Sequence, residues 1–222
     1  MKRLIFPLLL GLVGGAILIS LGMWQLNRLS WKEAILSDID ARILAAPVAV
    51  PATPDPQADR YLPVRAEGRF TGEFLDVLVS RKEIGAGVRM IEAFELTDGR
   101  RILVDRGFIR DAERGQPRES GAGEVIGNLH WPEEVDGYTP PPDAKTGLWF
   151  ARDLPAMAAK LRTEPVLIVA RMPTSAQIEP MAVDNSGIPN DHLGYAIQWF
   201  GLAIVWLGMT AYLLWRIRRR TL

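Results

Sequence analysis

The chain has 222 residues, with 26 basic and 26 acidic side chains, so its formal net charge is zero. A chain without excess positive charge gives no support for nucleic-acid binding. Cysteine is absent, which excludes disulfides, thiolate copper sites and iron–sulfur clusters. The mean hydropathy of +0.06 averages two apolar ends with a polar middle.

Residues 4–24 form an uncharged apolar segment. About 20 helical residues cross a hydrocarbon core of ~30 Å, so this segment predicts a transmembrane helix. Lys2 and Arg3 precede it, as in a secretory signal peptide. However, the apolar run exceeds the ~7–15 residues of a signal core, and no small-x-small cleavage site follows, so we expect an uncleaved anchor. Gly11 and Gly15 favour close packing of this helix against the second apolar segment.

The residues after the first span predict an amphipathic helix followed by a linker. Trp31, Ile35, Ile39 and Ile43 recur at every fourth position, which is typical of one helical face. The helix is therefore expected to continue through residues 25–46. Several prolines then predict an extended linker over residues 47–60.

Residues 61–180 contain short runs of valine, isoleucine and phenylalanine separated by glycines, which predict strands. The predicted strands cover residues 62–70, 74–80, 88–96, 101–109, 124–131 and 165–170. Asp98 and Gly99 predict a type I′ hairpin turn. Asp153 is predicted to cap a short helix that reaches Arg162. This region is therefore expected to be an α+β domain built on an antiparallel sheet or small barrel.

A second uncharged apolar segment covers residues 195–215, with aromatic residues near both of its ends. These match the aromatic belts of a transmembrane helix. A return segment, residues 181–194, precedes it, and a basic tail, residues 216–222, follows it. The positive-inside rule places residues 1–3 and this tail in the cytoplasm, and the central domain outside it. No Arg-rich and Ser-rich presequence is evident, so we expect a bacterial inner membrane with a periplasmic domain. The fold class is thus a membrane protein whose two transmembrane helices flank an extracytoplasmic α+β domain.

Most enzyme classes lack their motifs in this sequence. There is no Gly-x-Ser-x-Gly, His-Glu-x-x-His or Walker loop. For Asp105 and Arg106, within a predicted strand, a solvated strand face is favoured over a buried ion pair. His130 is interpreted as structural. A membrane-tethered hydrolase or transferase would need a cleft that combines these three residues.

His192 is the other histidine, and it lies just before the second span. If a helix begins there, Ala196, Trp199 and Ala203 share its face. A neutral imidazole at this position is suited to bind haem iron as an axial ligand. The alanines would admit a flat macrocycle, and Trp199 would stack on it. The alternative is a polar end-group at the membrane interface.

Trp24, Gln25 and Arg28 leave the first span at the same interface. Arg28 is suited to pair with a haem propionate, because a guanidinium binds carboxylates well. The alternative is that Arg28 extends to lipid headgroups.

Three sequence motifs resemble the Surfeit locus protein 1 family of cytochrome c oxidase assembly factors. They are GMWQLNR at 22–28 with Trp31 and Lys32, LVDRGF at 103–108, and NDHLGYAIQWF at 190–200. The resemblance covers essentially the whole chain. It implies that the protein delivers the a-type haem to oxidase subunit I or stabilises it there, and that the family's motif histidine aligns with His192.

The resemblance also implies partners and a mechanism. Haem a would be a transiently bound cargo, held between the two spans at the outer leaflet. The site would comprise His192 as axial ligand with Trp199, Arg28 and Trp24. A hydrogen bond at the second nitrogen of His192 is expected to fix the imidazole tautomer. The expected partners are oxidase subunit I, membrane lipid and, in addition, haem a synthase, but no nucleic acid. No catalysis is required. The alternative is an assembly scaffold that contacts subunit I without binding haem.

Overall fold

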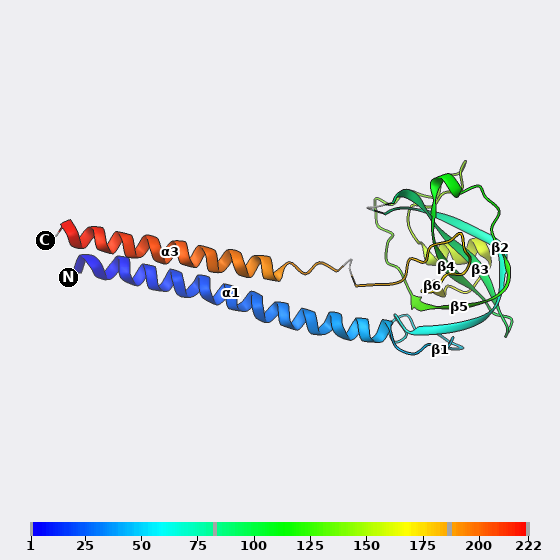
Figure 1. Ribbon diagram of the computed structural model, residues 1–222, viewed down its shortest axis with the longest axis horizontal. Helices are drawn as coiled ribbons and strands as arrows, with labels where there is room; N and C mark the ends of the chain where they lie inside the picture. Colours follow the sequence, from blue (N-terminus) through cyan, green and yellow to red (C-terminus); the bar gives the residue numbers. More distant parts are fainter. Residues whose placement is uncertain (1, 82–83, 186–187, 221–222) are drawn as a thin grey trace. The chain divides into compact units, whose positions relative to one another are not determined.

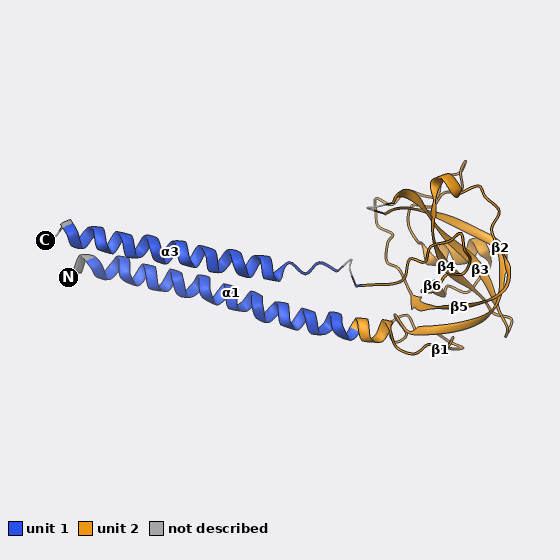
Figure 2. Cartoon of the chain, viewed as in Figure 1, with its two compact units in different colours: residues 1–38, 185–222 blue, residues 39–184 orange. Residues whose placement is uncertain are grey.

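The computed structural model describes residues 2–81, 84–185 and 188–220. The chain divides into two compact units, Met1–Asp38 with Asn185–Leu222 and Ile39–Asp184 (Figure 2). The predicted cytoplasmic ends at 1–3 and 216–222, and the predicted return segment at 181–194, fall partly outside the described residues. The folded unit is wider than the predicted 61–180, because it also takes in the end of the first helix and the predicted linker.

The first unit consists of two long helices, α1 (Lys2–Ile43) and α3 (His192–Arg220). Both are long and apolar enough to cross a membrane, with mean hydropathies of 2.5 and 1.6 over their most apolar windows. They run side by side, with the two chain ends at the same end of the pair (Figure 1). The apolar segments therefore form helices, as predicted, and α1 continues beyond its span to Ile43. Two such helices fit a membrane protein.

Glycines bring α1 and α3 into close contact. A Cβ atom on Gly11 would lie 2.2 Å from Cγ2 of Thr210, and one on Gly15 would lie 2.8 Å from Cδ2 of Leu207. The indole Nε1 of Trp206 donates a hydrogen bond of 3.1 Å to the carbonyl of Gly11. The predicted contact of Gly11 and Gly15 with the second span is confirmed.

The second unit is built on a closed barrel (Figure 1). Its strands are β2 (Pro63–Arg81), β3 (Gly85–Leu96), β4 (Arg101–Arg110), β5 (Gly121–His130) and β6 (Leu167–Ala170). The barrel closes because β2 pairs with β3 on one side and with β5 on the other. Neighbouring strands are antiparallel except β4 and β6, which are parallel. The predicted fold class is confirmed.

The predicted linker is not wholly free of regular structure. It contains the two-residue strand β1 (Val48–Ala49), which pairs in parallel with Val64 and Arg65 of β2.

The prediction of separate strands at 62–70 and 74–80 is wrong, because both belong to β2. Gly72 lies between them with φ of +82°, where the pairing with β3 shifts register. Such a bulge bends a strand without ending it. The bend matters for closure, because the first part of β2 pairs with β5 and the longer second part with β3.

The turn after β3 is at the predicted place but is of a different type. A type I′ turn needs positive φ at both central residues, whereas of Asp98 and Gly99 only Gly99 has it, at +87°. The Gly99 N–H donates to the carbonyl of Leu96 at 3.0 Å. The Asp98 carboxylate instead accepts from the backbone N–H of Arg100 at 2.9 Å.

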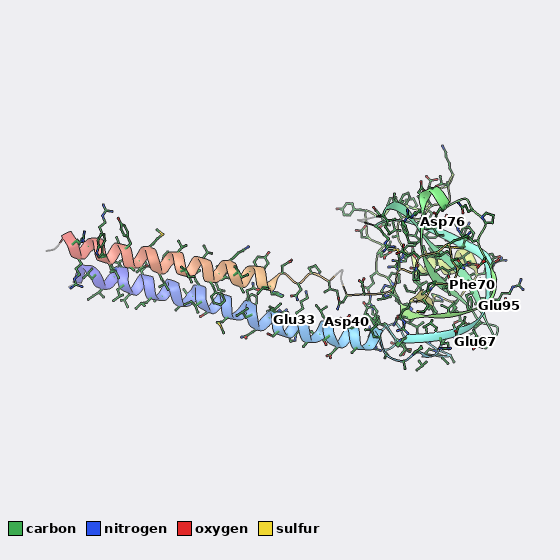
Figure 3. The ribbon with its side chains drawn as sticks, in the orientation of Figure 1. Glu33, Asp40, Glu67, Phe70, Asp76 and Glu95 are labelled. Atoms are coloured by element: carbon green, nitrogen blue, oxygen red, sulfur yellow. The ribbon has the colours of Figure 1, made fainter. Side chains whose placement is uncertain are left out.

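Two apolar clusters lie on the two faces of the sheet. The first contains Phe70, labelled in Figure 3, and Phe94, whose ring centroids are 4.7 Å apart. The second includes the buried residues of the short helix α2 (Leu154–Leu161) together with residues of β2, β3, β4 and β6. The Asp153 carboxylate accepts from the N–H of Ala156 at 3.1 Å, so the predicted helix cap is confirmed. A single 3₁₀ turn, η1 (Asp111–Glu113), follows β4.

Candidate functional site

His192 is the first residue of α3, and its imidazole meets a side chain of α1. Its Nδ1 lies 2.8 Å from Oε1 of Gln25. Gln25 is only 9% exposed, whereas His192 is half-buried. Among the described residues, this contact with Gln25 is the polar contact that holds the His192 imidazole against α1.

This contact decides which imidazole nitrogen is available to a ligand. An amide oxygen only accepts hydrogen bonds, so with Gln25 Oε1 facing the ring, Nδ1 carries the proton and donates a hydrogen bond to that oxygen. The lone pair of the neutral ring is then on Nε2. A hydrogen bond of this kind at one nitrogen orients a metal-binding histidine and fixes its tautomer.

The residues fit a haem better than a bare metal ion. Within the described residues, no group of three or more His, Asp or Glu side chains is placed to hold a metal. A haem macrocycle supplies four nitrogens to its iron and needs only an axial ligand from the protein. His192 can provide that ligand through Nε2.

At the His192 end of the helix pair, where the haem was expected, α1 and α3 are closely packed. Ala196 and Ala203 are 1% and 3% exposed, so their faces are already covered. A Cβ on Gly22 would lie 2.6 Å from Cε1 of Phe200. Further out, the Lys32 ammonium donates to the carbonyl of Pro189. The alanines therefore pack within the protein and do not leave a slot for a flat macrocycle between the spans.

The other predicted site residues belong to the same parts of α1 and α3 as Gln25 and His192. Trp24 is 56% exposed. The Arg28 guanidinium lies 4.2 Å from the ring centroid of Trp31, so Arg28 makes a cation–π contact within α1. Trp199 is half-buried on α3. By helical spacing Trp24, Arg28 and Trp31 share one flank of α1, next to the line of Gln25.

The interpretation of Asp105 and Arg106 as a solvated strand face is wrong. They are 0% and 1% exposed. Arg106 pairs with Glu92 at 2.6 Å and lies 4.2 Å from the Phe70 ring centroid. Asp105 instead pairs with Arg89 at 3.0 Å and Arg152 at 3.2 Å. A buried charge needs such partners. Asp105 and Arg106, although adjacent on β4, have different partners.

His130 belongs to the folded unit and stacks on Tyr61, with ring centroids 5.6 Å apart. Burial, together with the nearby positive charges of Arg152 and Arg60, lowers the pKa of His130 to about 4. It lines a small pocket with Arg89 and Arg152. Neither Asp105 nor Arg106 is among the residues that line this pocket with His130.

Sequence reasoning placed Gln25 and His192 at the same end of the two apolar segments but did not pair their side chains. It did not connect Tyr61, Arg89 and Arg152 to His130 at all. These residues come from separate parts of the chain, and no spacing rule joins them. The only local signal was the position of Gln25 and His192 at the same predicted end of two apolar segments.

A family model described as the SURF1 family matches residues 12–204 of the chain. The chain belongs to the SURF1 family. The match covers the barrel, most of α1 and the first part of α3, so family membership does not rest on one motif.

The chain is similar to SURF1 proteins from animals and from bacteria. Surfeit locus protein 1 of Rattus norvegicus is 29% identical over 219 residues, which cover 88% of this chain and 70% of that protein. The Homo sapiens protein of the same name is 31% identical over 206 residues, covering 82% and 69%. A SURF1-like protein of Rickettsia felis is 28% identical over 203 residues, covering 86% and 89%.

Proposed function

We propose that this protein is a cytochrome c oxidase assembly factor that binds a-type haem through His192 and helps place it in oxidase subunit I. The observation that carries the proposal is the contact of 2.8 Å between His192 Nδ1 and Gln25 Oε1. It leaves Nε2 of a half-buried imidazole as a ready axial ligand. Membership of the SURF1 family supports the assembly role.

The closed helix pair determines where the haem is proposed to bind. Because Ala196 and Ala203 are buried, the haem lies against the exposed side of His192 and not between the spans. Trp24 is the exposed aromatic side chain nearest in sequence to Gln25. Arg28 leaves Trp31 and pairs with a propionate, at the cost of one cation–π contact of about 0.5–1 kcal/mol. Trp199 lies two turns along α3 on the face of His192.

The proposed role needs no catalysis by this chain. Haem moves from a site of lower affinity to one of higher affinity, so subunit I takes it if its own site binds more tightly. Haem a synthase is the proposed donor. The helices lie in a bacterial inner membrane with both ends in the cytoplasm and the barrel in the periplasm, as the positive-inside rule favours.

The test uses the two histidines of the chain as a matched pair. The full chain is coexpressed with haem a synthase, purified in detergent, and its haem content and absorption spectrum are recorded. We expect His192→Ala to lose the bound haem, and His130→Ala to keep the content and spectrum of the unchanged protein. Haem retained with an unchanged spectrum in His192→Ala would overturn the ligand assignment.

The second candidate is an assembly scaffold that contacts subunit I without binding haem. The close packing of Ala196, Ala203 and Gly22 at the His192 end of α1 and α3 favours it, because these residues already contact protein. In this alternative, His192 and Gln25 only join the helix ends. A colourless preparation that still co-purifies with subunit I when haem a is supplied would select the scaffold.

A further inference from the structure

The barrel unit contains a small polar pocket that the proposed haem site does not use. Its volume is about 180 Å³. The pocket is lined by Tyr61, Arg89, His130, Arg152, Ala182, Val183 and Asp184. We propose that this pocket binds a small oxyanion, either a carboxylate or a phosphate.

Two arginines at the pocket are held in place by the buried carboxylate of Asp105, and one of them is also held by Glu134. The Arg89 Nε lies 3.0 Å from Asp105 Oδ2, and its Nη2 donates to the carbonyl of Met181 at 2.8 Å. Arg152 Nη1 lies 3.2 Å from the same oxygen of Asp105, and its Nε donates to Glu134 at 3.0 Å. The side chains of Arg89 and Arg152 are 14% and 9% exposed. Fixed guanidinium groups of this kind bind planar oxyanions with little loss of side-chain entropy.

His130 contributes a polar atom that the protein leaves without a partner. Its Nδ1 is buried and makes no hydrogen bond with any described residue. A buried polar atom of this kind costs about 1–3 kcal/mol, so a ligand that bonds to it recovers part of that cost. The low pKa of His130, about 4, keeps the ring neutral near pH 7, where it can donate one hydrogen bond to an anion.

The charges around His130 favour an anion over a cation. Arg152, Arg60 and Arg89 each disfavour the protonated imidazole, and Glu134 opposes them. The positive contribution therefore dominates at this position. Asp184 is the acidic member of the lining, so the anion is expected to lie toward the arginines and His130.

The backbone at Tyr61 supports a functional pocket. Tyr61 has φ of +67°, a left-handed conformation that is unfavourable for a bulky residue. Strain of this kind gathers at binding sites, where the surroundings hold it in place. Here it sets the Tyr61 ring against His130 and beneath the Arg60 guanidinium, at 5.7 Å from the ring centroid.

The test uses the full chain in detergent, with ¹⁵N-labelled histidine. Because there are only two histidines, the ring signals report separately on His130 and His192. We expect inorganic phosphate or acetate, added at constant ionic strength, to shift the His130 signals to saturation and leave His192 unchanged. The anion that binds more tightly, phosphate or acetate, identifies the class of ligand. A linear shift, or the same shift with sodium chloride alone, would overturn the proposal.

Variants distinguish the planar, forked geometry of the Arg89 guanidinium from its positive charge alone. Arg89→Lys keeps the charge but loses the fork, and we expect it to weaken binding by roughly tenfold, about 1.4 kcal/mol. Arg65→Gln removes an exposed arginine outside the pocket and should leave binding unchanged. If Arg89→Lys does not fold, His130→Phe replaces it in the test, because this variant keeps a ring that can stack on Tyr61. Phosphate should raise the Tm of the wild type but not that of His130→Phe. Equal binding by the wild type and these pocket variants would refute the site.

Discussion

His192 and Gln25, which are 167 residues apart in the sequence, are joined by a contact of 2.8 Å between Nδ1 and Oε1. The contact links the first residue of α3 to a buried position on α1. Under the proposed function, this contact orients the His192 ring and leaves Nε2 for a ligand.

Replacing Gln25 tests that relationship directly. Gln25→Leu removes the acceptor for Nδ1, so the ring loses its fixed tautomer, and we expect haem affinity to fall by roughly 10–100-fold. Gln198→Leu is the matched control, because Gln198 is an exposed glutamine on α3. Haem titration followed by absorption measures both. Equal affinities in the two variants would show that Gln25 does not position the ligand.

Gly22 and Gly208 provide a matched test of the helix contact. A Cβ on Gly22 would lie 2.6 Å from Phe200 Cε1, whereas one on Gly208 would have nothing within 4 Å. Overpacking typically costs about 1–3 kcal/mol, so Gly22→Leu should lower the free energy of unfolding in mixed detergent micelles by that amount. Gly208→Leu should change it little. Similar losses in both variants would argue against this close approach.

The buried pair of Arg106 and Glu92 is expected to be sensitive to the loss of one member. Arg106→Met leaves the Glu92 charge buried and unpaired, which costs about 3–5 kcal/mol. Adding Glu92→Gln removes that charge but keeps an oxygen for the Gly72 N–H, which donates to Glu92 at 2.8 Å. Thermal unfolding of the barrel should therefore show a large fall in Tm for the single variant and a partial recovery for the double variant.

The exposed pair of Arg65 and Glu124, at 2.6 Å, is the control for this comparison. Exposed pairs contribute about 0–1 kcal/mol, so Arg65→Gln should lower Tm only slightly. A double variant no more stable than Arg106→Met would contradict the argument from unpaired charge.

His130 predicts a specific dependence of stability on pH. Burial first, then Arg152 and Arg60, lower its pKa from 6.5 to about 4, with Arg89 adding to this and Glu134 opposing it. Between pH 4 and 6.5 His130 binds a proton in the unfolded chain but not in the folded chain. The free energy of unfolding is therefore unaffected by His130 above pH 6.5 and falls as the pH drops toward 4. His130→Phe should show a shallower fall of Tm between pH 6.5 and 4. Parallel curves for the wild type and the variant would show that His130 does not titrate in this way.

Local patterns in the sequence were enough to predict much of the architecture. The uncharged segments 4–24 and 195–215 predicted helices long and apolar enough to cross a membrane, because their length and polarity match the bilayer. Asp153 predicted that a helix begins after it, because its carboxylate can accept a hydrogen bond from a free N–H of the first turn. The runs of valine, isoleucine and phenylalanine separated by glycines predicted the strands, but not the bulge at Gly72, where one strand bends and pairs with two neighbours.

The sequence by itself determined that two apolar helices flank, along the chain, a domain built on an antiparallel sheet or small barrel, and that His192 lies just before the second apolar segment. Only the tertiary structure decided its partner, Gln25, and showed that Ala196 and Ala203 are covered. It also decided that Asp105 and Arg106 are buried with different partners. The physical reason is that periodicity and capping act over a few residues, whereas the partner of a buried polar group depends on side chains brought together from distant parts of the chain.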